Sequence, residues 1–293
     1  MREFVIAADS DSEIPYWFAE ENDLPVFLMP YSVDGKEELF DLGKTTDFKG
    51  FYDKLRNGAS AATATRSPID IENFFEGIIN DNKDILYICF SSQLSAHYEL
   101  ATGAKNNVLA RHPEAKIVIV DSVSIAMGDG MLIYHAVKLK KQGLSMDEIT
   151  EWLEKNKTRS LHFFSVDNLM YLKKTGRLSS VTATMGTILD LKPILNLTKD
   201  GKIVAFDKVK GKKKVVKYLA DMVAANQDET PESHDMVVVC HGDNPQMAQM
   251  LKEEVERRFD FKEIWYMDVG PVIGCHAGPG VLGLLMMGKE RPN

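Results

Sequence analysis

Two acidic residues near the start of the chain, Asp9 and Asp11, have the spacing of a phosphoryl-transfer pair. They follow a short apolar run in the sequence FVIAADSDSEIP, residues 4–15. In a magnesium-dependent phosphatase of this design, the first carboxylate attacks phosphorus and the second handles the proton. The alternative is structural, with Asp9 and Ser10 ending a strand and Ser12 capping a helix that begins at Glu13.

A second acidic motif later in the chain bears on this choice. The phosphatase mechanism needs another carboxylate pair to hold magnesium, and the candidate is Gly242-Asp243 in the sequence VVVCHGDNPQM. The motif requires a second Asp four residues after Asp243, and that position is occupied by Met247. The thioether of methionine cannot replace the hard oxygen ligands that Mg²⁺ requires. We therefore favour the structural interpretation and keep a magnesium-dependent phosphatase using Asp9 as the alternative function.

Composition excludes several other classes of function. The chain has 293 residues, 44% of them hydrophobic and 27% charged, which is typical of a globular protein with room for two domains. Its formal net charge of -8 argues against nucleic-acid binding. The cysteines, at positions 89, 240 and 275, lie too far apart for a Cys-x-x-Cys zinc or redox motif. We expect no catalytic residues, no cofactor and no metal.

No charged leader followed by an apolar core precedes the first strand, so the expected location is the cytoplasm. The longest apolar stretch, residues 269–288, is interrupted by Gly, Pro and His276. Such a segment makes a poor lipid-facing helix. We expect a loop between buried elements and no integral membrane segment.

The pattern of apolar runs predicts an α/β protein with two domains. Strands expected at 4–8, 25–33, 84–90 and 115–122 alternate with helices at 48–55, 69–79, 94–109 and 125–142, which favours a doubly wound, mostly parallel sheet. Residues 1–160 would form this N-terminal domain. Residues 161–293 would form an α+β domain, in which the Asp200-Gly201 turn predicts a β-hairpin.

Hydroxyl-bearing residues gather where the predicted strands of the first domain end. Thr63, Thr65 and Ser67 lie before one helix, and SSQLSAHY follows the strand at 84–90. Ligands of such sheets bind outside the carboxyl ends of the strands, close to the amino ends of helices. The hydroxyls therefore suit an anionic head group, although each of them is equally well explained as a helix N-cap.

The same segments carry a family resemblance that runs almost from end to end. AADSDSEIP, TATRSP, SSQLSAHY, VDSVSIAMGDG, LKKTGRLS, LKPILNLTKDGKI and DVGPVIGCHAGPG occur in the order of the DegV family. The chain resembles these bacterial fatty-acid-binding proteins, the acyl-carrier subunits of a fatty acid kinase system. The resemblance implies a DegV-like two-domain fold with the lipid between the domains.

The resemblance also implies a head-group site. The residues implied to hold the fatty-acid carboxylate are Thr63, Ser95 and His276, with Arg177 nearby. Further pocket residues would be Ser92, Arg66, His97, Ala277 and Gly278. Two hydroxyls and an imidazole could supply charge-assisted hydrogen bonds, which a buried carboxylate needs.

The implied ligand is a fatty acid of roughly C14 to C18, in the range where burial of the tail outweighs its ordering cost. The implied partner is the catalytic subunit of a fatty acid kinase, which would phosphorylate the exposed carboxylate while this chain catalyses nothing alone. The basic run KVKGKKKVVK, residues 208–217, is a candidate surface for that partner or for transient contact with acidic membrane lipids. A solvated strand end and helix start explain it equally well. A binding module for another small anion is a further alternative.

Several positions depart from the family pattern, in the loops around the implied donors: Asp11, Arg66, Ala96, His97, Thr175, Lys210 and Ala277. Arg66 and His97 could tighten the pocket or change which lipid fits. Lys210 stands where many members have Arg, and a lysine cannot copy a bidentate arginine contact.

Overall fold

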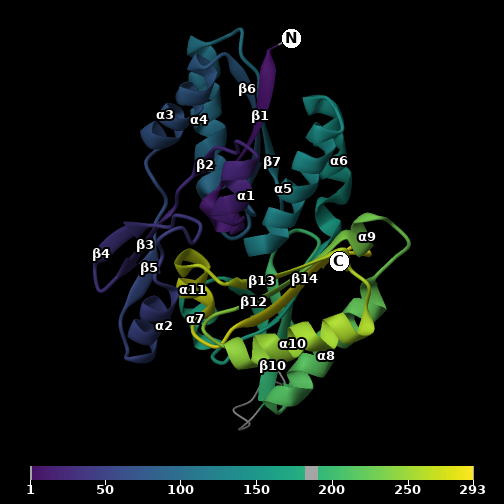
Figure 1. The fold of residues 1–293 in the computed structure, drawn as a ribbon. Helices are drawn as coiled ribbons and strands as arrows, with labels where there is room; N and C mark the ends of the chain where they lie inside the picture. The colour runs from purple at the N-terminus through teal and green to yellow at the C-terminus, as the bar shows by residue number, and fades with distance from the viewer. Residues whose placement is uncertain (1, 182–190, 293) are drawn as a thin grey trace. The chain divides into compact units, whose positions relative to one another are not determined.

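The computed structural model describes residues 2–181 and 191–292 (Figure 1). The chain forms two compact units, and we describe each by itself. The N-terminal unit comprises residues 1–31, 37–46 and 63–157, and the C-terminal unit comprises residues 32–36, 47–62 and 158–293. The change of unit after residue 157 lies close to the boundary at 160 expected from the sequence, and two earlier segments belong to the C-terminal unit.

The N-terminal unit is built on a four-stranded parallel sheet with the order β2-β1-β6-β7. Helices α3 and α4 lie on one side of this sheet, and α5 and α6 lie on the other (Figure 1). The bounds are β1 (Glu3–Asp9), β2 (Val26–Phe27), β6 (Lys83–Cys89), β7 (Ile117–Asp121), α1 (Tyr16–Glu21), α3 (Pro68–Asn80), α4 (His97–Arg111), α5 (Ala126–Lys141) and α6 (Met146–Asn156). The expected parallel α/β fold is confirmed.

The end of β1 differs from the predicted strand-to-helix turn. A single 3₁₀ turn, η1 (Ser10–Ser12), follows β1, and the Asp9 side chain caps it by accepting a hydrogen bond from the Asp11 backbone N–H at 3.1 Å. Helix α1 begins only after Pro15 and has no side-chain cap. The prediction that Ser12 caps a helix beginning at Glu13 was wrong, because a proline disfavours helical conformation in the residue before it.

The expected strand at 25–33 is broken into two. Its second part, β3 (Pro30–Val33), belongs to a separate three-stranded sheet with the order β4-β3-β5, whose other strands are β4 (Lys36–Leu39) and β5 (Ala61–Thr63). Asp34 and Gly35 connect β3 to β4 with φ values of 51° and 80°. Two successive positive φ values are typical of a type I′ hairpin turn. Helix α2 (Phe48–Arg56) precedes β5.

The C-terminal unit contains a mixed seven-stranded sheet with the order β13-β12-β14-β8-β10-β11-β9. Its bounds are β8 (Ser160–Ser165), β9 (Leu178–Val181), β10 (Leu191–Leu197), β11 (Ile203–Lys210), β12 (Met236–His241), β13 (Glu263–Asp268) and β14 (Leu282–Met287), with helices η2 (Lys157–Arg159), α7 (Met170–Lys174), α8 (Lys212–Asn226), α9 (Glu232–Asp235), α10 (Pro245–Arg258) and α11 (Pro271–Ala277). Strands β10 and β11 form the predicted antiparallel hairpin. Helices α8 and α10 pack on the sheet through fully buried residues such as Leu219 and Leu251.

The stretch at 269–288 was expected to be a loop, and this was wrong. It contains α11 and the buried strand β14, which pairs with β12 and β8 on its two sides. Most of the Gly and Pro residues lie at the ends of these elements or between them, but the apolar runs are long enough for a short helix and a strand. Within the two described ranges, every helix is too short or too polar to cross a bilayer.

Candidate functional site

The carboxyl ends of β1, β6 and β7 lie at one edge of the N-terminal sheet, and acidic side chains there hold the loop after β6. Asp9 Oδ2 accepts a hydrogen bond from the Phe90 backbone N–H at 3.1 Å. Asp121 Oδ1 accepts from the backbone N–H groups of Ser92 at 3.2 Å and Val123 at 3.0 Å. Two strand-end carboxylates therefore fix the path of the segment that carries Ser92 and Ser95.

Ser95 lies in the last turn before α4. Its backbone N–H donates to Ser91 O at 3.2 Å, and its hydroxyl oxygen accepts from the His97 backbone N–H at 3.2 Å. Both Ser92 and Ser95 are half-buried. A hydroxyl that accepts from the backbone keeps its own hydrogen, so Ser95 retains a donor for an anion.

Arg66 and His97 both contact the Phe27 ring. The Arg66 guanidinium is 4.8 Å from the centre of the Phe27 ring and forms an ion pair with Asp70 at 3.2 Å. The His97 ring stacks on Phe27 with a centroid distance of 5.4 Å and is fully buried. Thr63 ends β5 and is half-buried. Arg66 thus stays near the surface, while His97 belongs to the interior of the unit.

In the C-terminal unit, His276 occupies the last turn of α11, and Arg177 lies close enough to affect its charge. Burial, and to a smaller extent the positive charge of Arg177, lower the pKa of His276 to about 4. The imidazole is therefore neutral near pH 7. A neutral imidazole can still donate a charge-assisted hydrogen bond to a carboxylate, because the acceptor carries the charge.

The chain turn after α11 is tightly packed. Gly278 has a φ of 74°, and a Cβ atom at this position would lie 2.5 Å from Cδ2 of Tyr171. Its neighbour Ala277 is buried. Earlier in α11, a Cβ at Gly274 would lie 2.9 Å from the hydroxyl of Tyr52, which donates to Val269 O at 2.9 Å. Neither Gly274 nor Gly278 therefore leaves room for a larger side chain.

The predicted site residues thus fall into two groups. Thr63, Arg66, Ser92, Ser95 and His97 belong to the N-terminal unit, and Arg177, His276, Ala277 and Gly278 belong to the C-terminal unit. The structure brings Ser92 and Ser95 together in one loop, and it brings His276 and Arg177 together in the other unit.

Asp9, the candidate phosphatase nucleophile, is fully buried, and burial raises its pKa to about 6. Its two carboxylate oxygens accept from the backbone of Asp11 and Phe90. Asp243 of the proposed magnesium pair forms an ion pair with Arg56. Asp9 therefore holds two backbone N–H groups, and the Asp243 carboxylate is paired with an arginine.

The basic run at 208–217 covers the end of β11 and the start of α8. The side chains of Lys212, Lys213 and Lys214 are exposed in the first turn of α8, which has Gly211 as N-cap and no side-chain cap. Positive side chains at the positive end of a helix repel its dipole, so this turn would gain from an anionic neighbour.

Sequence reasoning missed the carboxylates that position the loop after β6. Asp121 was seen only as the end of a strand, and Asp9 only as a nucleophile or a strand end. The signal available was an Asp-Ser pair, Asp9-Ser10 and Asp121-Ser122, at or next to the end of two strands expected to be parallel. The packing of Tyr171 against Gly278 could not be predicted from a local pattern, because the two residues are far apart in the sequence.

The fold belongs to the α/β class, with a parallel N-terminal sheet and a mixed C-terminal sheet. Comparison with known proteins identifies the family. The family model described as "Uncharacterised protein, DegV family" matches residues 3–289. The chain therefore belongs to the DegV family.

Relatives and solved structures agree with this assignment. A DegV domain-containing protein of Clostridium perfringens is 33% identical over 291 residues, with 99% of each chain covered. A fatty-acid-binding DegV family protein of Thermus thermophilus superposes with a TM-score of 0.85 at 23% identity, covering 98% of this chain and 100% of that one. A stearic-acid-binding protein of Eubacterium ventriosum gives a TM-score of 0.82 at 22% identity, with 98% of each chain covered.

Proposed function

We propose that this protein binds a long-chain fatty acid and holds its carboxylate with Thr63, Ser95, His276 and Arg177. The observation that carries the proposal is the half-buried Ser95, fixed in a loop held by Asp9 and Asp121, in a family whose solved members bind such acids. Ser92, Arg66, His97, Ala277 and Gly278 would shape the surroundings of the head group.

The donors match the needs of a carboxylate. Taking an ionised carboxylate out of water is costly unless several donors meet it. Arg177 would supply a full positive charge, and Thr63, Ser95 and the neutral His276 would each donate one hydrogen bond. Because the bound anion favours the protonated imidazole, it would raise the pKa of His276 from about 4.

The tail supplies most of the affinity. Each buried methylene contributes about 0.8 kcal/mol, so a tail of about fifteen carbons gains on the order of 10 kcal/mol before ordering costs. We therefore propose acids of roughly C14 to C18. The stearic acid of the Eubacterium ventriosum protein lies in this range.

We further propose that the chain catalyses no reaction alone and presents the carboxylate to the catalytic subunit of a fatty acid kinase. The exposed lysines at 212–214 offer a positive surface for that subunit or for acidic membrane lipids. The proposed place of action is the cytoplasm, where ATP is available to the kinase.

The head-group assignment is tested by titrating lipid-free protein with palmitic acid in a calorimeter. Ser95→Ala should weaken binding by about 10-fold or more, because a hydrogen bond to a charged group contributes about 1.5–3 kcal/mol. Ser145→Ala is the matched control, since Ser145 caps α6 and should leave palmitate affinity unchanged. Equal affinity of the Ser95→Ala, His276→Asn and unmodified proteins would refute the assignment.

Presentation to a kinase is tested separately. Palmitate-loaded protein, ATP and a purified fatty acid kinase catalytic subunit should form an acyl phosphate, which hydroxylamine traps as a hydroxamate. Reversing the charge at Lys212 and Lys213 to Glu should slow this reaction without changing palmitate affinity. A rate unaffected by these substitutions would remove the lysines from the docking surface.

The alternative function, a magnesium-dependent phosphatase, predicts that the chain is catalytically active alone. Turnover of a generic phosphomonoester with Mg²⁺, abolished by Asp9→Asn, would establish it. Stabilisation by another small anion with none by fatty acids would instead support an anion-binding module.

A further inference from the structure

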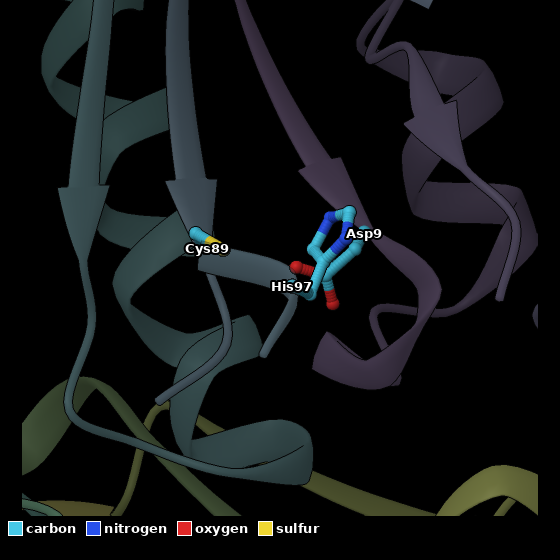
Figure 2. A group of neighbouring side chains, drawn as sticks. All are labelled: Asp9, Cys89 and His97. Atoms are coloured by element: carbon cyan, nitrogen blue, oxygen red, sulfur yellow. The ribbon is translucent and has the colours of Figure 1, made fainter. Parts of the chain in front are cut away.

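Three side chains with different metal-ligand atoms converge inside the N-terminal unit. Asp9 ends β1, Cys89 ends the adjacent β6, and His97 begins α4. Figure 2 shows the three side chains directed toward one another. One ligand atom from each lies within 4.8 Å of the other two, and all three residues are fully buried.

His97 is oriented as a metal-binding histidine would be. Its Nε2 atom lies 2.7 Å from the Tyr87 hydroxyl oxygen, and its buried Nδ1 atom has no hydrogen-bond partner among the described residues. Histidines that bind metals through one ring nitrogen commonly anchor the other on a second group, which fixes the ring.

Other buried acidic residues belong to the same unit as the three ligands. Asp11, two residues beyond Asp9, is buried and has a carboxylate oxygen, Oδ1, without a hydrogen-bond partner among the described residues. Asp129 of α5 is a further fully buried carboxyl of the same unit. A cation near Asp9 would offset this accumulation of buried acids.

The donor set selects the kind of cation. Mg²⁺ and Ca²⁺ take oxygen ligands, whereas a thiolate and an imidazole together suit Zn²⁺ and similar transition metals. Zn²⁺ binds Cys, His and Asp in tetrahedral sites, and three protein ligands with one further position is a common arrangement.

We propose that Asp9, Cys89 and His97 form a binding site for a thiophilic divalent cation, with Zn²⁺ as the fitting ion. A carboxylate oxygen of Asp9, Cys89 Sγ and His97 Nδ1 are the ligands. On binding, the S–H bond of Cys89 breaks, a S–Zn bond forms and the proton passes to the buffer. The ion would tie together the ends of β1 and β6 and the start of α4, and so hold the loop of residues 90–96 from both sides.

The site does not depend on fatty-acid binding, so its test uses metal as the only ligand. The full chain is unfolded in guanidinium with a chelator, refolded with ZnCl₂ or CoCl₂, and freed of loose metal by gel filtration. Elemental analysis should then find about one Zn²⁺ per chain. The Co²⁺ form should show a thiolate-to-metal charge-transfer band. Refolded protein with neither would overturn the proposal.

Variants decide whether Cys89 is the thiolate. Cys89→Ser should lower Zn²⁺ affinity by at least about 10–100-fold and remove the cobalt band. Cys240→Ser is the matched control, because Cys240 is also buried at a strand but lies in β12. A folded Cys89→Ser protein that keeps the band would refute the assignment.

A second variant covers the case in which Cys89→Ser does not fold. In the double variant Cys240→Ser/Cys275→Ser, Cys89 is the sole thiol of the chain. Its Co²⁺ form should keep the full band. A folded double variant whose Co²⁺ form lacks the band would refute Cys89 as a metal ligand.

Discussion

Acid should destabilise this protein through the partly buried ring of His276. Burial and the charge of Arg177 hold the pKa of His276 at about 4 in the native state, against an ordinary value of 6.5. The unfolded chain restores the ordinary value, so between pH 6.5 and 4 the unfolded state binds a proton that the native state does not. The stability contributed by the neutral ring is therefore complete above pH 6.5 and is lost as the pH falls toward 4.

The size of the effect follows from the two pKa values. The difference of 6.5 − 4, or 2.5 units, corresponds to about 3 kcal/mol of unfolding free energy once the pH reaches 4. At pH 5.5 the loss is about 1.4 kcal/mol, because the native state still excludes the proton there.

The assay is urea unfolding of lipid-free protein at pH 7.5, 6.5 and 5.5. Replacing the ring in His276→Asn should reduce the loss of stability between pH 7.5 and 5.5 by about 1.4 kcal/mol. Any constant cost of the substitution cancels, since only the change with pH is compared. His234→Asn is the control, because His234 is exposed. Parallel pH profiles for His276→Asn and wild type would refute the reasoning.

Three further substitutions test the packing around the site and the core behind it. Gly278→Ala should lower the free energy of unfolding by about 1–3 kcal/mol in urea, because its φ of 74° and the Tyr171 ring 2.5 Å from the new Cβ both oppose it; unchanged stability would contradict this geometry. Tyr52→Phe should cost about 1–1.5 kcal/mol by removing the hydrogen bond to Val269 O, and a thermal melt identical to wild type would argue against that bond. Leu251→Ala should cost about 2–5 kcal/mol because the side chain is fully buried, and a loss below 1 kcal/mol would show that the core is looser than described.

Much of the fold follows from local pattern. The run DILYICF predicts β6, whose residues Ile85 to Cys89 are fully buried, and the Asp200-Gly201 turn predicts the β10–β11 hairpin. The errors occurred where a proline or glycine decided the outcome. Helix α1 begins after Pro15 and not at Glu13. The glycines at 269–288 led us to expect a loop where the structure has a helix and a central strand.

The candidate site was only partly accessible from the sequence. Serines at a strand end pointed to an anion, because the geometry of parallel sheets places such residues at one edge. The set Thr63, Ser95, His276 and Arg177 came from the family resemblance, since no local pattern connects residues so distant in the chain. The same distance hid the convergence of Asp9, Cys89 and His97, which depends on the pairing of β1 with β6 and on where α4 begins.

The central claim is that this chain carries a fatty acid, and native mass spectrometry tests it most directly. Protein expressed in bacteria and purified without detergent should show a mass excess that denaturation releases as a C14 to C18 acid, at roughly one per chain. Protein that is consistently empty, and that stays empty after incubation with palmitate, would contradict the claim.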